Sequence, residues 1–366
     1  MGRHVPRPSP AARSVGAPAP GRRGPTGPVR PPRADDSWEK VADWYDALAS
    51  ERGSEYHQQV VIPGLLRLLE VRPWDTVCDL ACGQGAVTQA IARAGAQVTG
   101  VDLSPRLIEL AKRRSQEGTA LKVSQGVAPR SPKGIRYLVG DARHVPELKS
   151  GSFDAVTCVL AAMNVDPVEP LFAEMSRLLR PASPLPLRER ARRRPEPVEG
   201  VRGQSPLPAG GGHSEGEGPS PLPAGEGQGE GEVRLRHGPL QVPAPARAVI
   251  VILHPAFRIP RQSRWKWDEG RKLLTREVDR YLSPLSVPID MRPFNRPGET
   301  TTTTYHRPAG AYVNGLAQAG LLVDRFEEWP SHRTSQPGPR ARAEDRARDE
   351  FPLFLAIRAV KVAATP

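Results

Sequence analysis

One stretch constrains this chain more than any other: a buried-strand pattern that runs directly into a glycine turn. Residues 76–80 are mainly apolar, and Gly83 and Gly85 follow almost at once. A helical pattern over 86–94 comes next, and then a second apolar run over 97–102 that ends in an acidic residue. This is the spacing of one β-α-β unit, in which the two strands lie parallel in one sheet. The chain is therefore predicted to have an α/β fold.

Five further strands are predicted downstream, and helical patterns separate most of them. The last two strands are instead separated by an Arg- and Glu-rich excursion over 338–350, which is a solvated loop or helix and which allows an antiparallel strand pair. We therefore expect a doubly wound, seven-stranded, mostly parallel sheet with an antiparallel last strand. Residues 258–307 are predicted to be irregular, with an extended segment at 300–304. The five strands are predicted at 135–139, 153–160, 248–253, 321–328 and 352–360.

Two segments are predicted to be disordered. The tail at 1–35 contains nine prolines and seven arginines, and the stretch at 182–247 contains twelve prolines and twelve glycines. Neither can bury enough apolar surface to offset the entropy of ordering it. Joining the two sides of the second stretch restores a helix-to-strand connection. We therefore expect a single domain formed by 36–181 and 248–362, with a low-complexity insertion between the helix after strand four and strand five.

The sequence of the insertion leaves its origin open. Residues 205–210 recur as residues 220–225, and each copy is followed by alternating Glu and Gly. The repeat is too polar to build a solenoid core. It is compatible with a functional loop or with a translated mobile repeat.

Charge and cysteine content narrow the class of protein. Of the net charge of +12, residues 1–34 contribute +7 and the insertion +1, which leaves +4 for the rest of the chain. We therefore expect no nucleic-acid partner. Cys78, Cys82 and Cys158 lie in apolar surroundings without further ligands, so reduced thiols, a cytoplasmic location and no metal site are expected. No apolar run of about 18 residues occurs, so no membrane span is expected.

The candidate ligand-binding residues lie at or just after the ends of the first three predicted strands. Glycines let a backbone approach a ligand closely, and Asp102 can accept hydrogen bonds from both ribose hydroxyls. A dinucleotide fingerprint needs a third glycine where this chain has Thr88. Asp79, before the glycines, suits a cationic amine better than a pyrophosphate. Asp141 and Ala142, after the third strand, offer a carboxylate and a backbone amide to an adenine edge.

With these motifs the chain resembles the class I S-adenosylmethionine-dependent methyltransferases, particularly the small-molecule group that includes ubiquinone and menaquinone enzymes. The resemblance covers 38–362 without the insertion. It implies a Rossmann-like methyltransferase fold, S-adenosyl-L-methionine as cofactor, and in-line methyl transfer to a small-molecule acceptor. Beyond strand five the family diverges, so the acceptor is not implied. The implied cofactor-binding residues are Asp79, Ala81, Gly83 and Gly85 for the methionine portion, Asp102 for the ribose, and Leu103, Asp141 and Ala142 for the adenine.

Candidates for the acceptor side come from histidines and aromatic residues. His254 follows the fifth strand, at the edge where α/β folds bind ligands, and is a candidate base or acceptor contact. His306, beside Tyr305, is a second candidate, and His57 is a third. Tyr45 and Trp265 are candidate substrate contacts, although Tyr45 also fits a helix face packed on the core.

Three alternative functions stay open at this point. An NAD-dependent oxidoreductase would share the glycine turn and the acidic residue. An RNA methyltransferase would share the cofactor. A non-catalytic protein disrupted by the insertion would share only the fold. The sequence does not indicate an oligomeric state.

Overall fold

The chain is described here by a computed structural model. The predicted tail, Tyr45 and most of the predicted insertion lie outside the described residues. The structure describes residues 38–43, 54–124, 135–181, 245–291 and 301–362.

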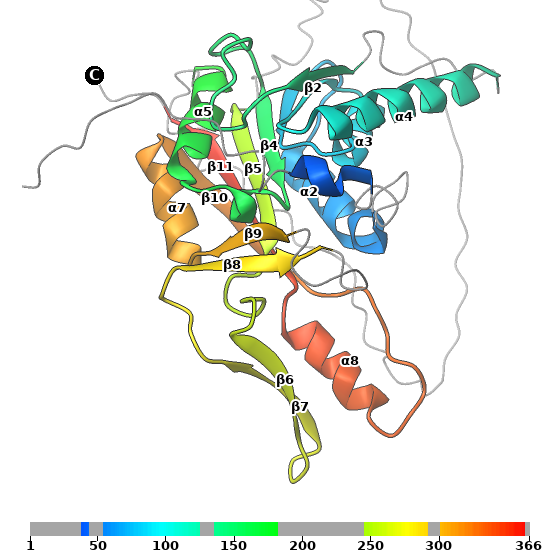
Figure 1. Ribbon diagram of the computed structural model, residues 1–366, viewed down its shortest axis with the longest axis vertical. Coiled ribbons are helices and arrows are strands. Elements are labelled where there is room, and N and C mark those ends of the chain that lie inside the picture. The colour runs from blue at the N-terminus through cyan, green and yellow to red at the C-terminus, as the bar shows by residue number, and fades with distance from the viewer. Residues whose placement is uncertain (1–37, 44–53, 125–134, 182–244, 292–300, 363–366) are drawn as a thin grey trace, which may run out of the picture.

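The centre of the molecule is a seven-stranded sheet with the strand order β10-β11-β5-β4-β1-β2-β3 (Figure 1). β11 runs antiparallel to both of its neighbours, and the pairs formed by β5, β4, β1, β2 and β3 are all parallel. The predicted seven strands and the antiparallel last strand are confirmed. The strands are β1 (Thr76–Leu80), β2 (Gln97–Asp102), β3 (Arg136–Val139), β4 (Ala155–Val159), β5 (Arg247–Leu253), β10 (Leu321–Trp329) and β11 (Phe354–Lys361).

Helices cover both faces of this sheet, because its central strands are apolar on both sides. In β5, Val249 and Val251 belong to the core shared with α2 and α3, whereas Ile250 and Ile252 belong to the core shared with α5 and α7. α4 packs on β2 and β3 through the contact of Ile108 with Tyr137 and its neighbours. The helices are α2 (Ile62–Leu69), α3 (Ala86–Arg93), α4 (Pro105–Ser124), α5 (Glu169–Leu178) and α7 (Ala309–Gln318).

The segment predicted to be irregular contains two β-hairpins, so this part of the prediction was wrong. β6 (Ser263–Asp268) pairs with β7 (Leu273–Val278), and β8 (Leu285–Asp290) pairs with β9 (Thr301–His306). β9 contains the extended segment predicted at 300–304. β8 does alternate apolar and polar residues, but β7 has no regular alternation and β9 consists mainly of threonines, so most of this segment gave only a weak strand pattern. α8 (Ala341–Glu350), from the predicted excursion, packs beside β7 (Figure 1).

The two ends of the predicted insertion are held by adjacent residues at the start of β4. The amide of Arg180 donates to the carbonyl of Phe153 at 2.9 Å, and the amide of Arg247 donates to the carbonyl of Asp154 at 3.1 Å. Arg247 itself is the first residue of β5 and is 2% exposed. The folded part of the chain therefore resumes before residue 247, slightly earlier than the sequence predicted.

Candidate functional site

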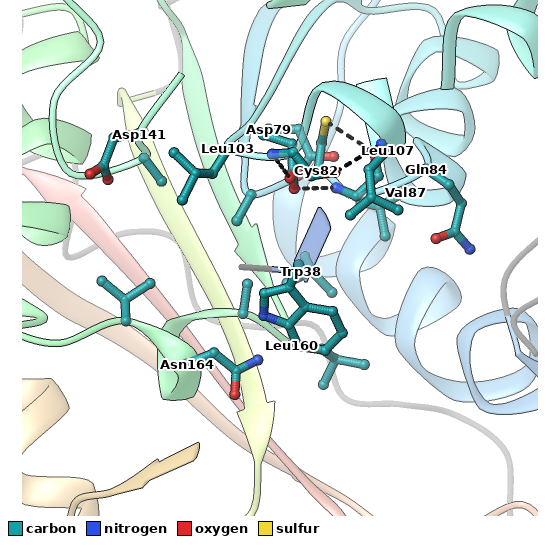
Figure 2. A pocket seen from close by; sticks show the side chains of 18 of the residues that line it. Trp38, Asp79, Cys82, Gln84, Val87, Leu103, Leu107, Asp141, Leu160 and Asn164 are labelled. Carbon is teal, nitrogen blue, oxygen red and sulfur yellow. Dashed lines mark hydrogen bonds between the residues drawn. The ribbon is translucent and has the colours of Figure 1, made fainter. Parts of the chain in front are cut away.

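A cavity of ≈ 250 Å³ opens at the carboxyl ends of β1, β2, β3 and β4 (Figure 2). This is the edge at which open α/β sheets bind ligands, because strand ends and helix N-termini meet there. Of the predicted cofactor-binding residues, all except Gly85 line this cavity. Its lining comprises Trp38, His57, Asp79, Ala81, Cys82, Gly83, Gln84, Ala86, Val87, Asp102, Leu103, Ser104, Leu107, Asp141, Ala142, Arg143, Val159, Leu160, Ala161, Asn164, Val165, Asp166, Thr303 and Tyr305.

The glycine turn between β1 and α3 needs residues without side chains. Gly83 and Gly85 have φ values of +56° and +82°, in the left-handed region that favours glycine. A Cβ at Gly85 would lie 2.6 Å from the hydroxyl of Tyr137, whereas a Cβ at Gly83 would meet nothing within 4 Å. Gly85 is thus required by packing. Gly83 keeps open the space that faces the cavity.

Asp79 is a buried carboxylate beneath this turn. Its Oδ2 accepts a hydrogen bond from Thr88 Oγ1 at 2.7 Å, and its Oδ1 accepts one from Thr157 Oγ1 at 2.8 Å. Burial raises the pKa of Asp79 to about 6, against the lowering effect of the two threonine hydroxyls. Thr88, which broke the dinucleotide pattern in the sequence, is therefore a partner of this carboxylate.

Asp102 is fixed at the end of β2 by two backbone amides. Gly83 N donates to Oδ2 at 2.8 Å, and Ser104 N donates to Oδ1 at 2.9 Å. Burial raises the pKa of Asp102, and the amides oppose that shift. Each carboxylate oxygen keeps a further acceptor position, so a ligand with two neighbouring hydroxyls can be held here.

Asp141 lies on the far wall from Asp79, with Leu103 between them in Figure 2, and Ala142 also lines the cavity. Arg143 holds the Asp141 carboxylate, with Nη2 2.7 Å from Oδ2. Burial raises the pKa of Asp141, but the hydrogen bonds from Arg143 outweigh this and lower it below its usual value. Leu103 is 41% exposed, which leaves an apolar side chain free to pack on a ligand.

The opposite end of the cavity is more apolar and carries a few polar groups. Trp38 and Leu160 form apolar walls there, next to Asn164 (Figure 2), and Thr303 and Tyr305, from the strand β9 that contacts the helix of Asn164, also line the cavity. The short helix η2 (Trp38–Val41) is fixed by Glu39, whose carboxylate accepts hydrogen bonds from the hydroxyl of Ser104 and the amide of Arg106. Most of these residues were not predicted from the sequence. Leu160 and Asn164 could have been found, because both come shortly after the carboxyl end of β4.

His57, at the start of the short helix η3 (His57–Val61), is the one histidine among the described lining residues. Its Nδ1 lies 2.8 Å from Ser54 Oγ. Burial lowers the pKa of His57, so the ring is neutral at neutral pH. A neutral imidazole with one nitrogen engaged can exchange a proton at the other.

The other predicted acceptor residues lie away from this cavity. His254 Nε2 is 2.7 Å from Glu328 Oε1, and its ring stacks on Phe257. His306 donates from Nε2 to the carbonyl of Tyr281 at 2.7 Å. Trp265 lines a different, smaller pocket. Tyr45 is outside the described residues, so its predicted role stays a prediction.

Part of the chain is similar to known methyltransferases. Residues 78–185 match the family model described as a methyltransferase domain. This match and the two curated relatives below support a class I S-adenosylmethionine-dependent methyltransferase, as the sequence predicted. Among the described residues, no helix is both long and apolar enough to cross a membrane.

Two curated relatives and one solved structure illustrate the similarity. The chain is 31% identical to the ubiquinone biosynthesis O-methyltransferase of Xanthomonas oryzae pv. oryzae over 30% of this chain and 40% of the relative. It is 29% identical to the demethylmenaquinone methyltransferase of Tropheryma whipplei over 32% of this chain and 43% of the relative. The match thus spans about two fifths of each relative. A crystal structure of an S-adenosylmethionine-dependent methyltransferase from Mesorhizobium loti aligns with a TM-score of 0.48 and 20% identity, over 82% of this chain and 96% of that one.

Proposed function

We propose that this chain transfers the methyl group of S-adenosyl-L-methionine to a small-molecule acceptor by direct in-line displacement. The observation that carries the proposal is the convergence of Asp79, Asp102 and Asp141 on one cavity, beside the open backbone of Gly83. The names of the two relatives, both methyltransferases connected with quinones, support a small-molecule acceptor.

The donor and acceptor chemistry of the cavity fits this cofactor. Besides its carboxylate, S-adenosylmethionine presents an ammonium, a sulfonium, two ribose hydroxyls and an adenine amino group, which are donors or cations. The cavity presents carboxylates, and Gln84 adds a buried Oε1 that has no hydrogen-bond partner among the described residues. Acceptors and negative charge on the wall therefore match donors and positive charge on the ligand.

A nicotinamide dinucleotide fits less well. Its diphosphate needs cations or free amides, yet Arg143 is the only Lys or Arg among the described lining residues and is already held by Asp141. The amide of Gly83 is likewise committed to Asp102. Like charges near the Asp79 carboxylate would oppose a diphosphate there.

In the proposed reaction the cofactor supplies an already activated methyl group on its sulfonium. The protein then has to align the acceptor with that methyl and exclude water, which is the main source of rate in such a transfer. Asp102 fixes the ribose, and Asp141 and Ala142 fix the adenine. Trp38 and Leu160 form an apolar wall that excludes water on the acceptor side.

The acceptor end suits an apolar or aromatic compound with a few polar substituents. Asn164 Oδ1 accepts a hydrogen bond from Thr304 Oγ1 at 3.1 Å, so its amide hydrogens are available to an acceptor oxygen. His57, neutral because burial lowers its pKa, is placed to take a proton from an acceptor hydroxyl. His254 and His306 have no part in this proposal, because neither lines the cavity.

We also infer that the protein acts in the cytoplasm. Cys78, Cys82 and Cys158 are all unpaired, which suits a reducing compartment.

Calorimetric titration with S-adenosylmethionine tests the proposal on the wild-type chain and on Asp102→Ala. The variant should bind roughly tenfold to a hundredfold more weakly, because a charged hydrogen-bond acceptor is lost. Asp349→Ala, which removes an exposed carboxylate on α8, is the matched control and should bind like the wild type. Tighter binding of NADH than of S-adenosylmethionine would favour the oxidoreductase, and binding of neither would refute the proposed activity.

A further inference from the structure

A second pocket lies beyond the acceptor end of the cofactor cavity, between the β6–β7 hairpin, α8 and the end of β5. Its volume is ≈ 110 Å³. The turn into η3 separates the two spaces, because Tyr56 lines the second pocket and His57 lines the cofactor cavity. None of the described residues that line the second pocket is acidic. Nothing in the proposed methyl transfer requires it.

Three arginines line this pocket, and two of them, Arg258 and Arg276, have no carboxylate partner among the described residues. Arg276 donates from Nε to the carbonyl of Phe257 at 2.9 Å and from Nη2 to Ser263 Oγ at 2.7 Å. Arg258 keeps access to solvent, and its guanidinium has no hydrogen bond or ion pair among the described residues. Partial burial and the positive charge of Arg258 both lower the pKa of Arg276, so the two charges lie close enough to repel each other.

The strand geometry of the hairpin leaves Arg276 without a carboxylate. Successive side chains of a strand point to opposite faces, so Glu277 faces away from Arg276. Glu277 pairs with Arg264 and Lys266 on that other face. Arg276 instead lies opposite Trp265 on β6, with its guanidinium 4.9 Å from the ring centroid.

The carboxylates nearest in sequence to the other walls form ion pairs with side chains other than Arg258 and Arg276. Glu55, next to Tyr56, pairs with His332 and Arg333. On α8, Asp345 and Glu344 pair with Arg348, the third arginine of the pocket, at 2.9 Å and 3.5 Å. The positive charges of Arg258 and Arg276 are therefore not neutralised by the described part of the chain.

Aromatic rings form the rest of the wall. Phe351 packs edge-on against both Phe257 and Trp265, with ring centroids 5.3 Å and 5.4 Å apart. Such rings hold the pocket open and offer an apolar surface next to the two guanidinium groups. Paired guanidinium groups beside a rigid apolar wall match a planar or tetrahedral oxyanion attached to an apolar group.

We propose that this second pocket binds the phosphate or carboxylate group of a small organic anion, held by Arg258 and Arg276. Arg276 is fixed in place by the Phe257 carbonyl and supplies the rigid half of the site. Arg258 has no hydrogen-bond or ion-pair partner in the described part of the chain, and it supplies the half that closes on the ligand. The site is separate from the cofactor cavity, so it does not depend on the proposed methyl transfer.

Thermal unfolding of the full chain tests the proposal, with inorganic phosphate, phenyl phosphate and benzoate as probes at constant ionic strength. We expect a saturable rise in Tm that chloride does not give, and a larger rise for phenyl phosphate than for inorganic phosphate. Benzoate and phenyl phosphate distinguish a carboxylate ligand from a phosphorylated one. The rise should persist with saturating S-adenosylhomocysteine, because the two sites are distinct.

Arg258→Gln is the decisive variant, because the Arg258 guanidinium makes no hydrogen bond or ion pair with the described residues and its loss should not destabilise them. It should keep the wild-type Tm without anion and weaken anion binding by roughly tenfold or more. Arg271→Gln, in the turn of the same hairpin and outside the pocket, is the matched control and should respond like the wild type. An anion response that survives Arg258→Gln, that chloride reproduces, or that S-adenosylhomocysteine abolishes would overturn the proposal.

Discussion

The hydroxyl of Thr88 donates to Oδ2 of Asp79 across 2.7 Å, and so connects the first turn of α3 to the last part of β1. Thr88 is fully buried and Asp79 is 1% exposed. A carboxylate taken so far out of water is stabilised by the few hydrogen bonds it accepts. The residue that breaks the dinucleotide fingerprint therefore supports the carboxylate that faces the proposed methionine site.

Replacement of Thr88 by valine removes this hydrogen bond and keeps the shape of the side chain. The free energy of unfolding should fall by about 1–3 kcal/mol, because a buried carboxylate loses one of its two hydroxyl partners. Urea denaturation measures the change. Thr275→Val is the control, since its hydroxyl bonds to Lys266 O at an exposed position and should change stability by less than about 0.5 kcal/mol. Equal effects of the two substitutions would contradict the role given to Thr88.

The raised pKa of Asp79 predicts how stability depends on pH. Its pKa is about 6 in the folded chain and about 3.9 in the unfolded chain. Between these values the folded chain retains a proton that the unfolded chain has lost, so the free energy of unfolding decreases as pH rises from about 4 to about 6. The decrease is of the order of 3 kcal/mol and is complete above pH 6. Asp79→Asn lacks the titrating carboxyl group, so the free energy of unfolding of the wild type should fall relative to that of the variant as pH rises from about 4 to about 6. Parallel plots of unfolding free energy against pH would contradict the assignment.

The same carboxylate should make S-adenosylmethionine binding depend on pH. A cationic ligand favours the ionised form of Asp79, so affinity should be constant above about pH 6 and fall by up to about tenfold per pH unit below it. Titration calorimetry between pH 5 and pH 8 measures this. Asp79→Asn should bind more weakly at pH 7.5 and should lose most of the pH dependence. A variant that retains the full pH dependence would exclude Asp79 as its source.

Gly85→Ala tests the packing of the glycine turn. The substitution places a Cβ 2.6 Å from the Tyr137 hydroxyl at a φ of +82°, so we expect a loss of stability of about 1–3 kcal/mol or more and weakened cofactor binding. Gly310→Ala is the control, because a Cβ there meets nothing within 4 Å and the residue lies in α7. That variant should be neutral or slightly stabilised, as measured by Tm.

Deletion of residues 182–244 tests whether the predicted insertion is separate from the domain. Arg180 and Arg247 bond to the adjacent residues Phe153 and Asp154, so a short connection can join the two sides. The shortened chain should fold with a Tm close to that of the full chain and bind S-adenosylmethionine equally well. A deletion that extends to the sequence-based boundary at residue 247, and so removes Arg247, should be much less stable, because that side chain pairs with Asp75 at 2.6 Å inside the fold. An insoluble product from the shorter deletion would refute the prediction.

The sequence predicted the sheet well, and it predicted that three acidic residues lie near one another at one edge of the sheet, because both depend on local patterns. Apolar runs mark the seven strands. Since parallel strands end at one edge, residues at or just after the carboxyl ends of β1, β2 and β3 had to lie near one another. Asp79, Asp102 and Asp141 all follow this rule.

The acceptor side was not predictable in the same way, because it depends on long-range pairing. His254 does follow the end of β5, but its ring turns toward Glu328 on β10, on the half of the sheet away from the glycine turn. In β9, Tyr305 lines the cavity and His306 does not. A shift of one residue in register reverses such a choice, and the register of β9 is set by its pairing with β8 rather than by its own sequence.

The attachment of the predicted insertion at the start of β4 has a practical consequence for studying the protein. The cavity lies at the other end of that strand, roughly 16 Å away for five residues. A fluorescent reporter or an affinity handle placed between Pro181 and Pro245 would therefore be tethered at the edge of the sheet opposite the cavity. Ligand entry could then be followed on a labelled chain without a label at the cavity mouth.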